Sequence, residues 1–150
     1  MRSAIVLLMV TICSLCNAQS TRYVRAEATG DGTGSSWNNA SGDLQAMINA
    51  SSSGDQIFVE VGTYQPNRRA DDVNTIIEND RNNAFVLKAD VKIYGGFDPD
   101  NSITDLSDRR KLPGAGANNS SILSGDLGIA DNYNDNAYHV VIAEIGRAHV

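Results

Sequence analysis

The sequence predicts an all-β fold: a right-handed parallel β-helix that begins with an N-terminal amphipathic capping helix and continues into its first turns. Two observations lead to this prediction. One short helical segment is followed only by short segments of alternating side chains. Loops of uneven length separate these segments. Parallel strands need long connections, and a coil of short strands supplies them without crossover helices.

The first predicted strand covers residues 22–26, where apolar and polar side chains alternate. Residues 30–36 are rich in glycine and hydroxyl side chains, which predicts a loop. Trp37 closes this loop, and we interpret it as a packing anchor against the core. A tryptophan that stacks on a sugar is the functional alternative.

Residues 41–52 are predicted to form the only helix of the mature chain, with Ser41 or Asp43 as its N-cap. Leu44, Met47 and Ile48 follow the i, i+3, i+4 spacing of one apolar stripe, and Gln45 and Asn49 lie off it. A β-helix exposes apolar side chains and unpaired backbone groups at its open end. The stripe therefore suits a helix that covers this end.

The rest of the mature chain is predicted to consist of strands and polar loops. In residues 56–61, Ile57, Val59 and Val61 share one face of a strand, and residues 62–66 end it. A β-sandwich would show similar strands but explains the position of the helix less well. The remaining predicted strands are 84–87, 91–94, 122–123 and 138–143, and the two long polar loops are 67–83 and 98–119.

The two ends of the chain read as separate from this domain. Residues 1–18 have the basic start, apolar run and small-residue end of a signal peptide, with cleavage before Gln19. Both cysteines lie in this segment, and Leu15 before Cys16 argues against lipidation. Residues 144–150 resemble the translation of a common sequencing adapter. We therefore expect residues 19–143 to be the first part of a longer secreted protein.

Charge and hydropathy argue against two classes of partner. The chain has a formal net charge of −6, and its arginines are scattered, whereas nucleic-acid binding needs a clustered basic face. The apolar run near the N-terminus is too short to cross a bilayer core of roughly 30 Å. The sequence therefore predicts neither a nucleic-acid partner nor a transmembrane helix in the mature chain.

Residues 23–142 resemble the N-terminal region of secreted β-helix proteins of the Bacteroidetes type, in the pectin-lyase-like superfamily. The likeness departs from the family pattern at residues 98–101, where the family more often has a Gly-Thr-Glu-like turn. Its order and spacing are carried by Gly32 with Ser36-Trp37 and Asn39-Ala40, Leu44-Gln45, Gly54-Asp55-Gln56-Ile57, Val59, Gly62-Thr63-Tyr64-Gln65-Pro66, Val91 to Phe97, Arg109, Ile122 to Asp126, and Tyr138 to Val141.

The resemblance implies outer-membrane passage and a protein that is secreted or held at the cell surface. Members of the family resemble adhesins, polymorphic surface proteins or polysaccharide-degrading enzymes, so the fold alone assigns no activity. We expect adhesion or a glycan-binding scaffold, with polysaccharide or host and cell-surface glycans as partners. The alternative is a polysaccharide lyase or glycosidase whose active-site turns lie beyond this segment.

Asp98, Asp100 and Asp105 are candidate calcium ligands, with the hydroxyls of Ser102 and Thr104 between them. An EF-hand loop would need glycine at its sixth position and glutamate at its twelfth, but this sequence has Ile103 and Arg109 there. This mismatch favours a solvated polar loop. A second acidic loop contains Asp126, Asp131 and Asp135, which bind calcium only if folding gathers them. Calcium is thus the only cofactor that the sequence suggests.

His139 is the only histidine of residues 19–143, and Ser124 and Asp126 lie near it in sequence. Nucleophilic catalysis requires a defined geometry between such groups, which sequence proximity does not provide. We therefore predict no catalytic residue in this chain.

Overall fold

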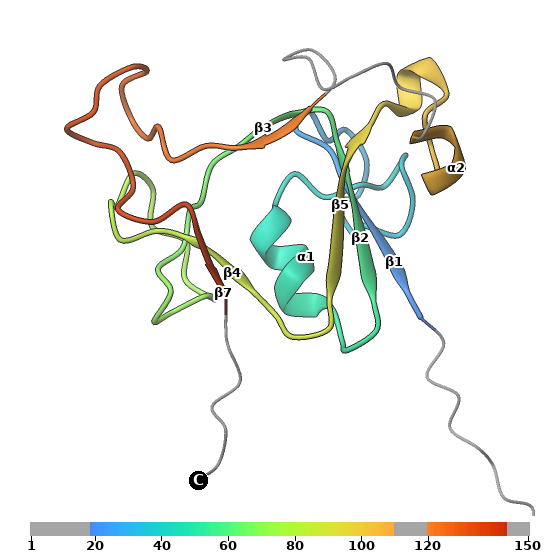
Figure 1. Cartoon of the computed structure of the whole chain (residues 1–150), viewed down its shortest axis with the longest axis horizontal. Helices are drawn as coiled ribbons and strands as arrows, with labels where there is room; N and C mark the ends of the chain where they lie inside the picture. The colour runs from blue at the N-terminus through green and yellow to red at the C-terminus, as the bar shows by residue number, and fades with distance from the viewer. Residues whose placement is uncertain (1–18, 110–119, 144–150) are drawn as a thin grey trace, which may run out of the picture.

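The computed structural model describes residues 19–109 and 120–143, shown in colour in Figure 1. The helices and strands in these ranges are short, and most of them are strands. In chain order they are β1 (Thr21–Val24), α1 (Leu44–Ala50), β2 (Gln56–Glu60), β3 (Gly62–Tyr64), β4 (Phe85–Leu87), β5 (Lys92–Phe97), the 3₁₀ helix η1 (Pro99–Asn101), α2 (Leu106–Arg109), β6 (Ser121–Leu123) and β7 (Val141–Ala143).

The strands form three small sheets, and every pair of neighbouring strands is parallel. The largest sheet has the order β1-β2-β5, and the other two are the pairs β3-β6 and β4-β7. In Figure 1 the three-stranded sheet and the β4-β7 pair lie on opposite sides of α1. The connections between paired strands are long, because parallel pairing requires the chain to return to the same end of the sheet.

The core lies between the three-stranded sheet and α1. Ile57 and Val59 of β2 are buried on the face that meets the helix, as the alternation of residues 56–61 predicted. Val24 of β1 is paired with Val59 and is fully buried. The buried core cluster consists of Val24, Leu44, Met47, Ile48, Ile57, Val59, Tyr64 and Phe85.

Helix α1 begins as the sequence predicted, and Asp43 is its N-cap. The Asp43 side chain accepts a hydrogen bond from the Ala46 N–H at 2.8 Å, which satisfies one of the free donors of the first turn. The helix ends at Ser51, which has an extended conformation and whose hydroxyl donates to the Met47 carbonyl. The stripe of Leu44, Met47 and Ile48 is buried, as expected.

Gln45 was expected off the apolar stripe, yet only 2% of it is exposed. Its amide hydrogen-bonds both backbone groups of Val86: Oε1 accepts from the N–H at 2.8 Å and Nε2 donates to the carbonyl at 3.3 Å. Nε2 also donates to Asn49 Oδ1 at 2.8 Å. The glutamine therefore occupies the edge of β4 as a neighbouring strand would.

The prediction of an all-β right-handed parallel β-helix is wrong for the residues that the structure describes. They form small separate sheets together with helices, and no solenoid of stacked turns. Helix α1 contacts β1, β2 and β4. The physical reason is that each sheet joins only two or three strands, fewer than a stable stack of repeated turns needs. The β-sandwich alternative is also excluded for these strands, because their pairing is parallel.

The predicted signal peptide (1–18) and the predicted adapter-derived tail (144–150) lie outside the described residues. Within the described ranges, no helix has the length and hydrophobicity needed to cross a bilayer.

Candidate functional site

A polar pocket of about 180 Å³ lies where the N-terminal end of α1 meets β3 and β4. We call it the polar pocket. Its walls come from segments that are far apart in the sequence, so only folding assembles it. The lining residues are Ala26, Gly42, Asp43, Leu44, Thr63, Tyr64, Gln65, Pro66, Asn67, Glu78, Asn79, Phe85 and Leu127.

Asp43 is fixed in one wall of the polar pocket by an ion pair with Arg68. Arg68 Nη1 lies 2.7 Å from Asp43 Oδ2 and donates to Oδ1 at 2.9 Å. The same guanidinium nitrogen donates to Asn67 Oδ1 at 2.7 Å. The arginine side chain is only 8% exposed, so this is a mostly buried pair, and its charge is compensated at Asp43.

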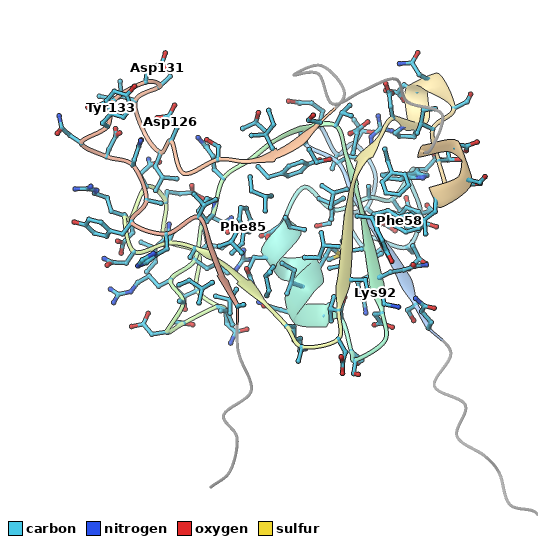
Figure 2. All side chains as sticks on the ribbon, in the orientation of Figure 1. Phe58, Phe85, Lys92, Asp126, Asp131 and Tyr133 are labelled. Carbon is cyan, nitrogen blue, oxygen red and sulfur yellow. The ribbon has the colours of Figure 1, made fainter. Side chains whose placement is uncertain are left out.

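Tyr64 and Phe85 give the polar pocket two aromatic rings. Figure 2 shows Phe85 between β4 and α1, where it is 2% exposed. The Tyr64 hydroxyl donates to the Glu60 carbonyl at 3.1 Å, which fixes the ring. Burial raises the pKa of Tyr64 far above its ordinary value, and the nearby Glu60 raises it further, so the phenol stays protonated. Tyr64 therefore supplies a neutral, rigid wall.

The rim of the polar pocket carries exposed hydrogen-bonding side chains: Thr63, Gln65, Glu78 and Asn79. Asn79 Oδ1 accepts from the Gly128 N–H at 3.0 Å, and Gln65 Nε2 donates to the Asp126 carbonyl. Glu78 makes no hydrogen bond or ion pair with the residues that the structure describes. Its carboxylate is therefore available to a ligand in the pocket.

A second, larger pocket of about 440 Å³ lies between α1, residues 70–74 and the end of β4. Its one lysine is already engaged, because Lys88 Nζ donates to the carbonyls of Ser51 at 2.6 Å and Asn49 at 3.1 Å. Asn49 Nδ2 in turn donates to the Val73 carbonyl at 2.7 Å. The polar groups of this pocket are thus largely used to hold the helix end and the loop in place.

Aromatic side chains form a continuous cluster on the face of the three-stranded sheet that points away from α1, which we call the outer face. Tyr23, Phe58 and Tyr94 are neighbours across β1, β2 and β5. Their ring centroids lie 5.9 Å and 6.0 Å apart, in edge-to-face arrangements. Figure 2 shows Phe58 on this side of the sheet.

Phe97 joins the outer face because the pairing of β2 with β5 shifts between Phe58 and Glu60. Phe97 consequently stacks on Phe58 with centroids 4.4 Å apart. Trp37 packs against Tyr23 and Phe97, and its Nε1 donates to the Thr104 carbonyl at 3.1 Å. The interpretation of Trp37 as a packing residue is therefore supported, but it packs on the outer face and not on the main core.

An ion-pair network borders the outer face. Arg25 lies 2.9 Å from Glu60 and 2.8 Å from Asp100. Burial raises the pKa of Glu60 above its ordinary value, and the positive charge of Arg25 opposes this shift. The network fastens residues 98–104 to the sheet, and the Trp37–Thr104 hydrogen bond adds a second attachment.

The candidate calcium ligands have separate partners. Asp98 is the N-cap of η1 and accepts from the Asn101 N–H at 3.2 Å and from its side chain at 2.8 Å. Asp100 pairs with Arg25, and Asp105 accepts from the Ser107 N–H at 2.7 Å. In the part of the chain that the structure describes, no group of three or more His, Cys, Asp and Glu side chains is arranged to hold a metal ion.

The second acidic loop is organised by its own hydrogen bonds. Asp126 Oδ2 accepts from the Asp131 N–H at 3.0 Å, and Asp135 Oδ2 accepts from the Ile129 N–H at 2.9 Å. Figure 2 shows Asp126 and Asp131 at the tip of the molecule distant from Phe58. The three carboxylates are not brought into one metal-binding group among the described residues.

His139 is exposed and makes no hydrogen bond or ion pair with the described residues. Ser124 Oγ accepts from the Asp126 N–H at 3.1 Å, which is a local turn contact. The structure therefore does not join these residues into a nucleophile and base pair.

The residues of the polar pocket were not recognised as a site in the sequence. Tyr64 lies in the Gly62-Thr63-Tyr64 segment, which was interpreted as the end of a strand but forms β3. Glu78 and Asn79 lie in a polar loop that showed no motif. No local signal was available, because the pocket combines residues whose proximity depends on the parallel pairing of distant strands.

No protein-family model, curated protein sequence or solved structure matches this chain.

Proposed function

We propose that this protein is a secreted or cell-surface glycan-binding protein that acts in adhesion or as a scaffold, and that the polar pocket is its binding site. The observation that carries the proposal is the composition of the pocket. Two carboxylates, several side-chain amides and a hydroxyl converge on one concavity, whose inner wall includes the mostly buried rings of Tyr64 and Phe85. Sugars present apolar ring faces and many hydroxyl groups, so they need both kinds of partner.

Binding without catalysis accounts better for the carboxylates than hydrolysis does. A glycosidase uses two carboxyl groups, one as an acid and one as a base or nucleophile. In the polar pocket, both oxygens of Asp43 are engaged by Arg68, and one also accepts the Ala46 N–H. These contacts occupy both oxygens of Asp43, so this carboxylate is not free to act on the glycosidic bond of a sugar in the pocket.

The test is a glycan array probed with the full chain and with a variant whose pocket is filled. Thr63→Trp places a large ring at an exposed position of the pocket wall, and Thr29→Trp is the matched control at an exposed position outside the pocket. We expect Thr63→Trp to weaken binding at least about tenfold, roughly 1.4 kcal/mol, and Thr29→Trp to leave it unchanged.

Two results would contradict this proposal. One is the absence of binding to any glycan by a chain that melts cooperatively. The other is equal binding by Thr63→Trp and the unaltered chain, which would move the site away from the polar pocket.

The proposed location is tested separately. A bacterial host that exports the full chain should release a protein whose first residue is Gln19. Retention of Met1 in the cytoplasmic fraction would contradict secretion.

A further inference from the structure

The size of the polar pocket limits what can enter it. Its volume is about 180 Å³, whereas pockets for drug-sized ligands measure roughly 300–1,000 Å³. An apolar cavity of about 150 Å³ holds one benzene ring. The pocket therefore has room for one six-membered ring, and the exposed rim leaves further units of a chain in solvent.

The charge of the polar pocket limits the class of that ring. Among the described residues that line it, Asp43 and Glu78 are acidic, and none is lysine, arginine or histidine. Arg68 stands behind Asp43, but its Nη1 is shared between Asp43 and Asn67. Glu78 has no described partner. An acidic ligand would therefore meet an uncompensated carboxylate and no free cation.

We infer that the polar pocket accepts one non-acidic sugar ring, a neutral hexose or a hexosamine, and rejects uronic and sialic acids. This inference rests on the proposed glycan-binding function and names its ligand class. The hydroxyl groups of such a ring donate to Glu78, while the side-chain amides of the rim both donate and accept. Glu78 is thus the residue that sets the charge preference.

The test compares sugars that differ only in an acidic group. Glucose is paired with glucuronic acid and galactose with galacturonic acid, each as the terminal unit of an immobilised glycan. We expect the full chain to prefer the neutral member of each pair. Preference for the acidic members, or equal binding of both, would overturn the inference while leaving the proposed function standing. Binding to neither member of any pair, together with no binding to any other glycan on the array, would contradict the proposed function itself.

Glu78 variants test the cause of the preference. Glu78→Lys reverses the charge and should shift the neutral-to-acidic ratio toward the acids by about threefold or more, with Glu78→Gln giving a smaller shift in the same direction. Glu27→Lys is the matched control, because Glu27 is also exposed and lies outside the pocket wall. A ratio that is the same in Glu78→Lys and Glu27→Lys would overturn the role of Glu78.

Discussion

Replacement of Gln45 by leucine tests the contact that joins α1 to β4. Gln45 is 2% exposed, and its amide satisfies both backbone groups of Val86. Leucine has a similar size but no polar atoms, so it leaves a donor and an acceptor without their partner. Each polar group left unsatisfied costs about 1–3 kcal/mol, and the added apolar contact offsets part of this. We expect the free energy of unfolding to fall by about 2–4 kcal/mol.

The assay is urea denaturation followed by the fluorescence of Trp37, the only tryptophan. Gln56→Leu is the matched control, because Gln56 is half-buried and its Nε2 makes one hydrogen bond, to Thr21 Oγ1 at 2.9 Å. The control should lose about 0.5–1 kcal/mol. If Gln45→Leu costs no more than the control, the account of Gln45 as a substitute for a neighbouring strand is refuted.

Two further predictions concern the loop glycines and acid stability. In the same denaturation assay, Gly34→Ala should destabilise the fold by about 2–3 kcal/mol more than Gly32→Ala. Both glycines have positive φ, but only a Cβ at position 34 would overlap Met47 Sδ. Equal losses of stability in the two variants would contradict this prediction. Two backbone N–H groups, those of Ser52 and Ser20, hold the pKa of Asp55 below its ordinary value, so its contribution to stability is present at neutral pH and is lost as the pH falls below about 4. The difference in Tm between the unaltered chain and Asp55→Asn should therefore shrink from pH 6 to pH 2, and a constant difference would contradict the assignment.

Local patterns predicted the elements that depend on local chemistry. The alternation of Ile57 and Val59 identified the face of β2 that packs on α1, and the spacing of Leu44, Met47 and Ile48 identified the buried stripe of α1. In both cases the side chains that pack together are set by the period of one element.

Local sequence patterns did not predict how those elements are arranged relative to one another. The burial of Gln45 depends on Val86, and a helical period contains no information about that strand. Residues 62–64 were interpreted as a strand end, but they form β3 because β6 pairs with them. The prediction of a solenoid was wrong for the same reason, because the residues of one strand do not show which distant strand pairs with it.

The candidate sites show the same difference between what local sequence and what long-range contacts determine. Acidic spacing suggested Asp98, Asp100 and Asp105 as calcium candidates, although the mismatch with an EF-hand loop favoured a solvated loop. The structure gives each a separate partner: the N-terminal end of η1, an arginine, and the N–H of Ser107. Calcium binding stays a prediction. The sequence did not predict the polar pocket because its walls come from segments that are far apart in the sequence.

The most direct test of the account is an NMR titration of the ¹⁵N-labelled full chain with the neutral sugar that binds best on the array. The account predicts that the amides of Thr63, Asn79 and Leu127, around the polar pocket, shift in a saturable way, while those of Phe58 and Tyr94 on the outer face stay unchanged. Shifts confined to the outer face would contradict the central claim, because they would place the sugar on the aromatic cluster and not in the polar pocket.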